Sequence, residues 1–375
     1  MKKKKLLLIT AIPPYPQNSG GATRIKNTIQ ELSKYFDLYL ITFAYFTEND
    51  NLKKWCKETI YIPFTENRTA FSFIKFSQPY WFSAWYSKKL IKEVKKITNK
   101  INFDYIQIEF SQLLYLIDHL GYQNKEKSIF TAHDISTVSF YRRLKETKNI
   151  FKKIIHFFRL LEIYLYEKKY LPKYKQINVV SDNDKKILSK LFKTKKIIVV
   201  PNGIEEIEFL KNNPSDTINL GYIGSFSHPP NKTAVLYFIN KIAPLLEKNK
   251  IKFKYYLAGS NNNIKEKNVV NLGYVNNLKE FFRKIDILIT PISAGSGSRI
   301  KILEALGYGK KVISSRIGIE GININTKLIS ICNNPQEYLN QIIKYQTTNF
   351  EIEKENILKL TWHNIFCKYY EQLGK

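Results

Sequence analysis

The chain has 375 residues, of which 44% are hydrophobic and 14% aromatic, and this composition excludes an intrinsically disordered protein. Its length is too great for one ordinary domain and suits two. The formal net charge is +28, and 37 Lys and Arg against 18 Asp and Glu place +19 of it in residues 1–205. This charge allows nucleic acid, an anionic membrane or a phosphorylated substrate as partner. The alternative is that the lysines are simply solvated and have no anionic partner.

The cysteines and the N-terminal residues bear on where the protein resides. Cys56, Cys332 and Cys367 have neither the spacing of metal ligands nor that of a disulfide framework, which favours a reducing cytoplasm. Residues 1–16 imitate a secretory signal, but their apolar run is short and lacks a small-residue cleavage site, so a buried first strand is the better interpretation. No apolar stretch reaches the roughly 18 residues that indicate a membrane span. We expect a cytoplasmic protein, soluble or peripheral to the membrane.

Short apolar runs alternate with amphipathic helical patterns along most of the chain, which is typical of α/β architecture with parallel sheets. The polar segment 205–217 has a proline and little periodicity and separates two series of runs. We therefore predict one domain over 1–205 and a second over 206–350. A helix is expected from about Ala22 to Tyr35. The predicted strands are 5–10, 38–43, 59–63, 105–109, 128–133, 177–181, 197–203, 218–225, 254–260, 269–275, 287–292 and 310–315.

A pair of glycines, Gly20 and Gly21, stands between the first predicted strand and the first predicted helix. Free backbone N–H groups at the positive end of a helix suit a phosphate or a sugar. A plain turn with Ser19 near the N-cap explains the same residues equally well. The spaced third glycine of a dinucleotide-binding loop is absent.

His133 and Asp134 follow the predicted strand 128–133 and are expected at the edge of a cleft. A histidine in this position can hydrogen-bond a substrate hydroxyl or a developing charge. A structural histidine is the more common case, so both interpretations stay open.

An Asp-x-Asp pair, Asp182 and Asp184, lies in the segment SDND. Such a pair can hold a divalent metal on the phosphates of a sugar nucleotide. It also follows a strand and opens a helical pattern, so capping of that helix by Ser181 or Asp182 is the favoured interpretation.

The segment 149–171 predicts a basic amphipathic helix with one apolar stripe. Such a helix can lie on an anionic membrane. More often it buries the stripe in its own domain, and this second interpretation is favoured. The stripe consists of Phe151, Ile154, Ile155, Phe158, Leu161 and Leu165.

The second domain opens with a strand that ends at Gly224 and Ser225, followed by Pro229, Pro230 and Asn231 before a helix. Glycine allows a ligand to come close to the backbone. As a bare pattern, this loop is a weak indication of a binding site.

The stretch 295–314, GSGSRIKILEALGYGKKVIS, is the strongest indication of a binding site. Its glycine loop places the backbone N–H groups of Gly297, Ser298 and Arg299 at the start of a predicted helix, and the Arg299 and Lys301 side chains add two full positive charges. Such a site suits a dianion, most naturally a pyrophosphate.

Glu304 lies one helical turn beyond Lys301. A carboxylate only accepts hydrogen bonds, so a ribose diol would satisfy it. The alternative is a surface ion pair between Lys301 and Glu304 beside a plain glycine turn.

In these motifs the chain resembles the retaining glycosyltransferases of family 4, the glycosyl transferases group 1, which have the GT-B fold. The resemblance covers nearly the whole chain, and the donor motif carries it most specifically. The similar segments, in the family's order, are VVSDND at 179–184, VVPNGIE at 199–205, LGYIGSFSHPPN at 220–231, GSGSRIKILEALGYGKKVISSRIGIEG at 295–321 and LTWHNIFCKYYEQL at 360–373.

The resemblance implies an α/β fold of two doubly wound, Rossmann-like domains that face a central cleft. A C-terminal helix over 351–375, and more narrowly about 352–373, should return to the first domain, which faces the acceptor. The second domain would hold a nucleotide-sugar donor.

The resemblance also implies roles for single residues. Glu304 would bind the donor ribose, and Arg299 and Lys301 the diphosphate. The backbone of Ser296, Gly297 and Ser298 would face the sugar and phosphates. By the same resemblance, His133 would lie near the transferred sugar. The loops at Gly20 and Gly21, and at Gly224 and Ser225, would approach the bound donor.

Two departures from the family pattern leave the donor sugar open. The first of two glutamates spaced eight apart is replaced by Ser296. Where many members carry an arginine after the first strand of the second domain, this chain offers Ser225, His228 and Lys232.

We expect a cytoplasmic glycosyltransferase that moves a sugar from a nucleoside diphosphate to a surface glycan or lipid-linked acceptor, with retention of anomeric configuration. No cofactor or divalent metal is expected, and the inner, anionic membrane face is an expected peripheral contact. A nucleotide-sugar epimerase of similar fold is the first alternative, but it needs a base, and no cluster of carboxylates and histidines is recognisable. Nucleic-acid binding ranks lowest, because the aromatic residues follow core patterns rather than basic patches.

Overall fold

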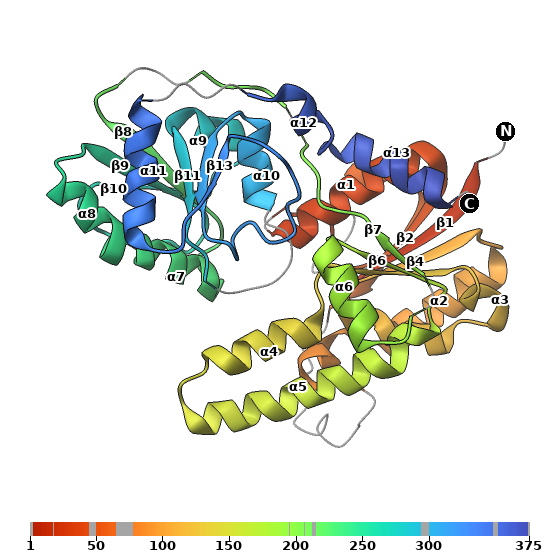
Figure 1. The fold of residues 1–375 in the computed structure, drawn as a ribbon. Helices are drawn as coiled ribbons and strands as arrows, with labels where there is room; N and C mark the ends of the chain where they lie inside the picture. Colours follow the sequence, from red (N-terminus) through yellow and green to blue (C-terminus); the bar gives the residue numbers. More distant parts are fainter. Residues whose placement is uncertain are drawn as a thin grey trace. The chain divides into compact units, whose positions relative to one another are not determined.

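The computed structural model describes residues 3–17, 19–44, 50–64, 78–194, 196–205, 207–211, 215–293, 300–347 and 352–373. The chain forms two compact units, one of Met1–Pro201 with Phe366–Lys375 and one of Asn202–Ile365. Each unit contains a parallel sheet with helices packed on it (Figure 1). The predicted fold class of two Rossmann-like α/β domains is therefore confirmed.

Within the described residues, the sheet of the first unit has seven parallel strands in the order β3-β2-β1-β4-β5-β6-β7. Its central strand β1 contains Leu6, Leu7, Leu8 and Ile9, all fully buried, because a central parallel strand is covered on both faces. The strands are β1 (Lys4–Thr10), β2 (Phe36–Ala44), β3 (Cys56–Pro63), β4 (Tyr105–Glu109), β5 (Ser128–Ala132), β6 (Gln176–Val179) and β7 (Ile197–Val199).

The helices of the first unit begin at polar caps where the sequence offers them. The Ser19 hydroxyl accepts a hydrogen bond from the Ala22 N–H, and the Ser181 hydroxyl accepts one from the Asp184 N–H, so the capping interpretation of the SDND segment is confirmed for Ser181. The helices are α1 (Gly20–Tyr35), α2 (Lys88–Lys100), α3 (Tyr122–Lys125), α4 (Ser136–Glu146), α5 (Ile150–Tyr170) and α6 (Asp182–Leu191), with short 3₁₀ turns η1 (Asp50–Leu52), η3 (Tyr80–Trp85), η4 (Ser111–His119) and η5 (Leu171–Lys173).

The described part of the second unit forms a sheet of six parallel strands in the order β10-β9-β8-β11-β12-β13. Two separate hydrophobic clusters cover its two faces. The strands are β8 (Ile218–Ile223), β9 (Phe253–Ala258), β10 (Val269–Gly273), β11 (Ile287–Thr290), β12 (Lys311–Ser314) and β13 (Ile329–Ile331). The helices are α7 (Pro229–Tyr237), the π-helical turn η6 (Phe238–Ile242), α8 (Ala243–Lys248), α9 (Leu278–Lys284), α10 (Ile300–Gly307), α11 (Pro335–Thr347) and α12 (Lys354–Leu358). Helix α13 (Trp362–Leu373) begins in this unit and belongs to the first unit from Phe366 onward.

The C-terminal helix expected over about 352–373 is two helices, α12 and α13. A short bridge interrupts them, because the Ile204 N–H donates to the Leu360 carbonyl at 2.8 Å and the Trp362 N–H donates to the Ile204 carbonyl at 3.2 Å. Within the first unit, the last turns of α13 pack on α1, where the Tyr370 ring stacks on Tyr35 with 4.4 Å between centroids.

Helices α4 and α5 lie side by side as an antiparallel pair (Figure 1). The expectation that α5 buries its predicted stripe in its own domain is wrong. The six side chains of that stripe are 44% to 76% exposed. The helix instead buries another face, with Ile163, Tyr166 and Tyr170, in the first unit.

Glu167 on α5 is a buried carboxylate that caps the start of α4. It accepts hydrogen bonds from the Ser136 N–H at 3.0 Å, the Thr137 N–H at 3.1 Å and the Thr137 hydroxyl at 2.6 Å. Burial raises the Glu167 pKa to about 7, although the hydrogen bonds from Thr137 lower it. One side chain thus satisfies the first N–H groups of a neighbouring helix.

We predict that Glu167→Gln lowers the free energy of unfolding by about 1–3 kcal/mol, because an amide cannot accept from all these donors and leaves buried groups unsatisfied. The folded pKa lies above the ordinary 4.5, so the carboxyl's contribution to stability is full below pH 4.5 and is lost as the pH rises to about 7. Chemical denaturation across this pH range measures both effects. The control, Glu146→Gln at the exposed end of α4, should change stability by less than about 0.5 kcal/mol. Equal effects of the two substitutions would contradict the capping role.

Candidate functional site

The carboxyl ends of β8 and β11 form the place in the second unit where strand order reverses. Open α/β sheets bind ligands outside the carboxyl ends of their strands at such a point. Strand β8 leads into Gly224 and Ser225, and the segment after β11 leads into α10, which carries Lys301 and Glu304. The topology therefore brings four of the sequence-predicted residues to one edge of one sheet.

Lys301 is held in place by neighbours from β8 and α7. Its Nζ donates a hydrogen bond to Asn231 Oδ1 at 3.0 Å and lies 4.1 Å from the centre of the Tyr222 ring. The Tyr222 hydroxyl donates to the same Asn231 oxygen at 2.7 Å, and Asn231 Nδ2 donates to the Ser225 carbonyl at 2.8 Å. These contacts fix a half-buried positive charge beside the loop that follows β8. The sequence alone gave no specific role to Tyr222 or Asn231.

Gly224 leaves the space that Lys301 occupies. A Cβ atom there would lie 2.8 Å from Lys301 Nζ and 2.8 Å from Asn231 Nδ2, and the Gly224 φ of 153° is one that other residues rarely adopt. The Gly259 Cα also packs so closely on the Gly224 carbonyl that a side chain at Gly259 would overlap it. The glycine thus permits close approach of a cation and a backbone.

Glu304 is half-buried on α10, one turn after Lys301. Burial, and then the charge of Glu205, raise its pKa to about 7 against the opposing effect of the Lys301 charge. The carboxyl therefore changes its charge near neutral pH. As a carboxylate it would accept hydrogen bonds from a diol.

The four remaining residues of the predicted glycine loop are Ser296, Gly297, Ser298 and Arg299. They lie outside the described residues. The roles predicted for them stay predictions.

In the first unit, Gly20 and Gly21 are the first residues of α1, beside the strand reversal between β1 and β4. A Cβ on Gly21 would lie 3.0 Å from Ile12 Cδ1 and 3.4 Å from the Phe110 ring. The helix start is therefore closely packed against the segment that follows β4. The phosphate-binding and plain-turn interpretations of these glycines both fit this geometry.

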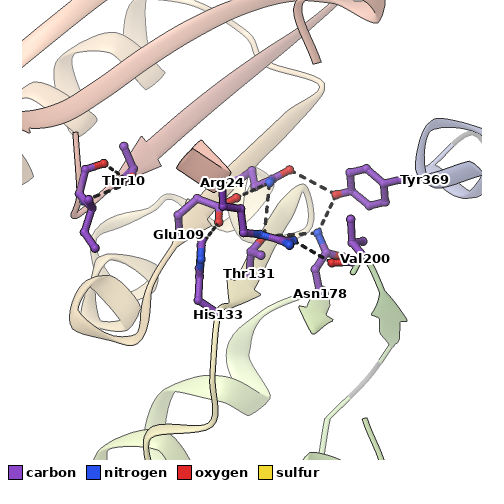
Figure 2. Close-up of polar contacts among 10 residues, drawn as sticks. Thr10, Arg24, Glu109, Thr131, His133, Asn178, Val200 and Tyr369 are labelled. Carbon is purple, nitrogen blue, oxygen red and sulfur yellow. Dashed lines mark hydrogen bonds and ion pairs between the residues drawn. The ribbon is translucent and has the colours of Figure 1, made fainter. Parts of the chain in front are cut away.

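His133 follows β5 and pairs with Glu109 at the end of β4 (Figure 2). His133 Nε2 lies 2.6 Å from Glu109 Oε2, and the two side chains are 13% and 1% exposed. The Phe110 ring stacks on the imidazole with 3.7 Å between centroids. Phe110 adopts a φ of 75°, a conformation that costs energy for an aromatic residue. The imidazole is thus clamped in one orientation.

A buried polar network continues from Glu109 across the sheet (Figure 2). Gln107 Nε2 donates to the second Glu109 oxygen at 2.5 Å. The Gln107 carbonyl oxygen accepts from the Tyr369 hydroxyl at 3.2 Å, and that hydroxyl accepts from Asn178 Nδ2 at 2.8 Å. The buried Arg24 guanidinium donates to the Val200 carbonyl at 2.8 Å.

The charges of this network set the state of His133. Burial alone would raise the Glu109 pKa, but the hydrogen bond and charge of His133, and then the Arg24 charge, outweigh it and lower the pKa. Burial lowers the His133 pKa, and Glu109 offsets only part of this. An ionised Glu109 accepts only, so the Nε2–H of neutral His133 donates to it and leaves Nδ1 as an acceptor.

Sequence reasoning found His133 but missed Glu109, Gln107, Arg24, Asn178 and Tyr369. A usable signal existed in YIQIE, residues 105–109, where two polar residues alternate within an otherwise apolar strand. A polar side chain in a strand that is buried on both faces needs a partner.

Within the ranges that the structure describes, no group of three or more His, Cys, Asp or Glu is arranged to hold a metal ion. No helix within them is both long and apolar enough to cross a membrane.

Comparison with known proteins finds a family match for part of the chain. Residues 217–347, which contain Gly224, Ser225, Lys301 and Glu304, match the family described as Glycosyl transferases group 1. The chain is also 26% identical over 368 residues, 91% of its length and 90% of the relative's, to the "Uncharacterized 44.6 kDa protein in cps region" of Klebsiella pneumoniae.

Two solved structures share the fold over their whole length. Sucrose-phosphate synthase from Thermosynechococcus elongatus has a TM-score of 0.71 at 14% identity, covering 99% of each chain. Anabaena HepE in complex with UDP and glucose has a TM-score of 0.64 at 12% identity, also covering 99% of each chain. The fold is that of the GT-B glycosyltransferases. The matched domain and this fold together support a GT-B glycosyltransferase.

The Glu109–His133 pair has a direct test. We predict that Glu109→Gln lowers the His133 pKa further, because the hydrogen bond and charge of Glu109 raise it against the effect of burial. NMR titration of the imidazole signals measures this change. His119 serves as a control in the same spectra, since burial, Lys95 and Asp118 set its pKa. An unchanged His133 pKa in a folded variant would rule out the pairing.

Proposed function

We propose that this protein is a retaining glycosyltransferase. It moves a sugar from a nucleoside-diphosphate sugar to a glycan or lipid-linked acceptor in cytoplasmic polysaccharide biosynthesis. The observation that carries the proposal is the Lys301 ammonium, fixed by Asn231 and Tyr222 at the strand reversal of the second unit. This position lies inside the segment that matches the group 1 glycosyltransferases.

The comparisons support the substrate class and the biological process. HepE, which has the same fold, was solved with UDP and glucose, so we propose a nucleotide sugar as donor. The relative from the cps region supports a role in polysaccharide biosynthesis. The excess of +19 in residues 1–205 fits an acceptor that carries phosphate.

Different residues would bind the charged diphosphate and the hydroxyl-bearing ribose of the donor. Lys301, with Arg299 from the glycine loop, would neutralise the diphosphate, and Gly224 lets the backbone come close to it. Glu304, one turn further along α10, would accept hydrogen bonds from the ribose diol.

The reaction breaks the bond between the anomeric carbon and the diphosphate oxygen and forms a bond from that carbon to the acceptor oxygen. With retention, the acceptor attacks from the face that the diphosphate leaves, and its proton passes to a departing phosphate oxygen. Negative charge grows on the diphosphate as the bond breaks, so the fixed Lys301 ammonium stabilises the transition state more than the ground state.

His133 would bind the sugar rather than attack it. Its neutral ring presents Nδ1 as an acceptor for a sugar hydroxyl, because Nε2–H is committed to Glu109. Glu109 is a positioning residue in this scheme, since it fixes the tautomer and orientation of the imidazole.

A nucleotide-sugar epimerase is the second candidate, since the structure does pair a carboxylate with a histidine, Glu109 with His133. Glu109 is a poor general base, because it is 1% exposed and both its oxygens accept hydrogen bonds. Incubation of the donor without acceptor separates the two functions. A changed sugar configuration in the recovered donor would favour the epimerase.

We predict that Glu304→Gln weakens donor binding about 10- to 150-fold, the equivalent of about 1.5–3 kcal/mol for a hydrogen bond to a charged group. The wild-type affinity should rise as the pH rises through about 7, because only the ionised carboxyl accepts from both hydroxyls. The variant should lack this dependence.

Calorimetry with the donor measures both effects. Glu247→Gln, which removes an exposed carboxylate on α8 of the same unit, is the matched control and should leave affinity unchanged. Wild-type affinity that stays flat with pH, together with unchanged affinity of Glu304→Gln, would remove Glu304 from the site.

We predict that transfer needs no divalent metal, because Lys301 and Arg299 supply the positive charge that a metal ion would otherwise bring. Turnover in excess EDTA should equal turnover without it, and Lys301→Ala should reduce kcat while leaving the unfolding temperature nearly unchanged. Activity that EDTA abolishes and Mg²⁺ or Mn²⁺ restores would make Asp182 and Asp184 candidates for metal binding again.

A further inference from the structure

Helix α5 presents an apolar face to solvent, which we call the α5 face. Its members recur at helical spacing, so they form one continuous stripe along the helix. Exposure ranges from 44% at Leu161 to 76% at Phe151. The α5 face consists of Ile150, Phe151, Ile154, Ile155, Phe157, Phe158, Leu161 and Leu165.

The helix has a second apolar face that holds it in the first unit. Ile163, Tyr166 and Tyr170 are buried there, and Glu167 ties α5 to the start of α4. The buried contacts that hold α5 in this unit therefore lie on a different face of the helix from the α5 face. Large contiguous apolar patches on a protein surface mark contacts with other proteins or with membranes.

The charge around the α5 face selects between these partners. Residues 141–158, which form the distal half of the α4–α5 pair, contain six Lys and Arg against one acidic residue. Partial burial, and then the charges of Arg143 and Lys152, lower the pKa of His156 within this segment. Two copies of the chain meeting through this surface would bring like charges together, which opposes association. Lipid phosphates would neutralise them.

We propose that the α5 face inserts into the interfacial region of an anionic membrane, with the surrounding lysines and arginines at the headgroups. Phenylalanine and isoleucine side chains enter the boundary between headgroups and acyl chains, and basic side chains bind the surface potential. This places the first unit, with its network around His133, at the surface where a lipid-linked acceptor would be presented. The binding itself needs no catalytic step.

The test uses the full chain and sedimentation with vesicles. Vesicles of phosphatidylglycerol and phosphatidylcholine should bind the protein at low salt, and vesicles of phosphatidylcholine alone should bind it much less. The double variant F151S and F158S should reduce binding at least about tenfold, because serine removes the apolar surface that each phenylalanine would bury in the membrane interface. The control Y122S removes an aromatic side chain that is 81% exposed on α3 and should bind like wild type.

A second set of variants tests the charges. Changing Lys152, Lys153, Lys168 and Lys169 to Gln should reduce binding at least about tenfold at low salt, and the effect should shrink as salt screens the surface. The control changes four exposed lysines of α2, Lys88, Lys89, Lys92 and Lys96, to Gln and should reduce binding less.

Two results would overturn the proposal. One is unchanged vesicle binding by the F151S and F158S variant. The other is a dimer in light scattering that this variant dissociates, which would assign the α5 face to a second copy of the chain. Neither measurement involves a sugar donor, so failure here leaves the proposed glycosyl transfer untouched, and failure of transfer leaves this proposal intact.

Discussion

A positive charge at the carboxyl edge of a parallel sheet has to be held by neighbours, and in this protein the topology of the second unit supplies them. Strands β8 and β11 are neighbours in the sheet, and the order of strands along the chain runs outward in opposite directions from this pair. The loop after β8 and the helix after β11 therefore meet at one place. Lys301 comes from that helix, and Asn231 and Tyr222 come from the β8 side. Gly224 has no side chain that would fill the space. The proposed chemistry depends on this one contact.

The first unit also has a strand reversal in its parallel sheet, but there the edge of the sheet has a different charge. Here the edge carries a buried negative charge on Glu109, which is stabilised by His133, Gln107 and the positive charge of Arg24. Such a charge is costly to bury unless each oxygen has a partner. The ionised Glu109 keeps His133 in one tautomer. In the proposed function, Glu109 therefore acts only through His133, by fixing which ring nitrogen can accept a hydrogen bond.

The fold was largely predictable from the sequence, because parallel strands that are buried on both faces read as short apolar runs. Every predicted strand is present, and among the described residues one further strand, β13, was not predicted. The break between α12 and α13 was not predictable, since the pairing of Thr361 with Ile204 depends on distant residues. The face that α5 buries was misjudged for a related reason. The helix has two apolar faces, and only tertiary packing decides which one is covered.

For the candidate site, sequence motifs identified Lys301, Glu304 and His133 but not the residues that hold them, because Asn231 and Glu109 are ordinary polar residues until the fold brings them close. The account is tested most directly by a thermal-shift screen of UDP, GDP, ADP and CDP sugars. At 100 times its dissociation constant a ligand adds about 2.7 kcal/mol to stability. We expect one donor to raise the unfolding temperature of the wild type and to have much less effect on Lys301→Ala. If no donor stabilises the wild type, or if Lys301→Ala responds equally, the site is not where this structure indicates.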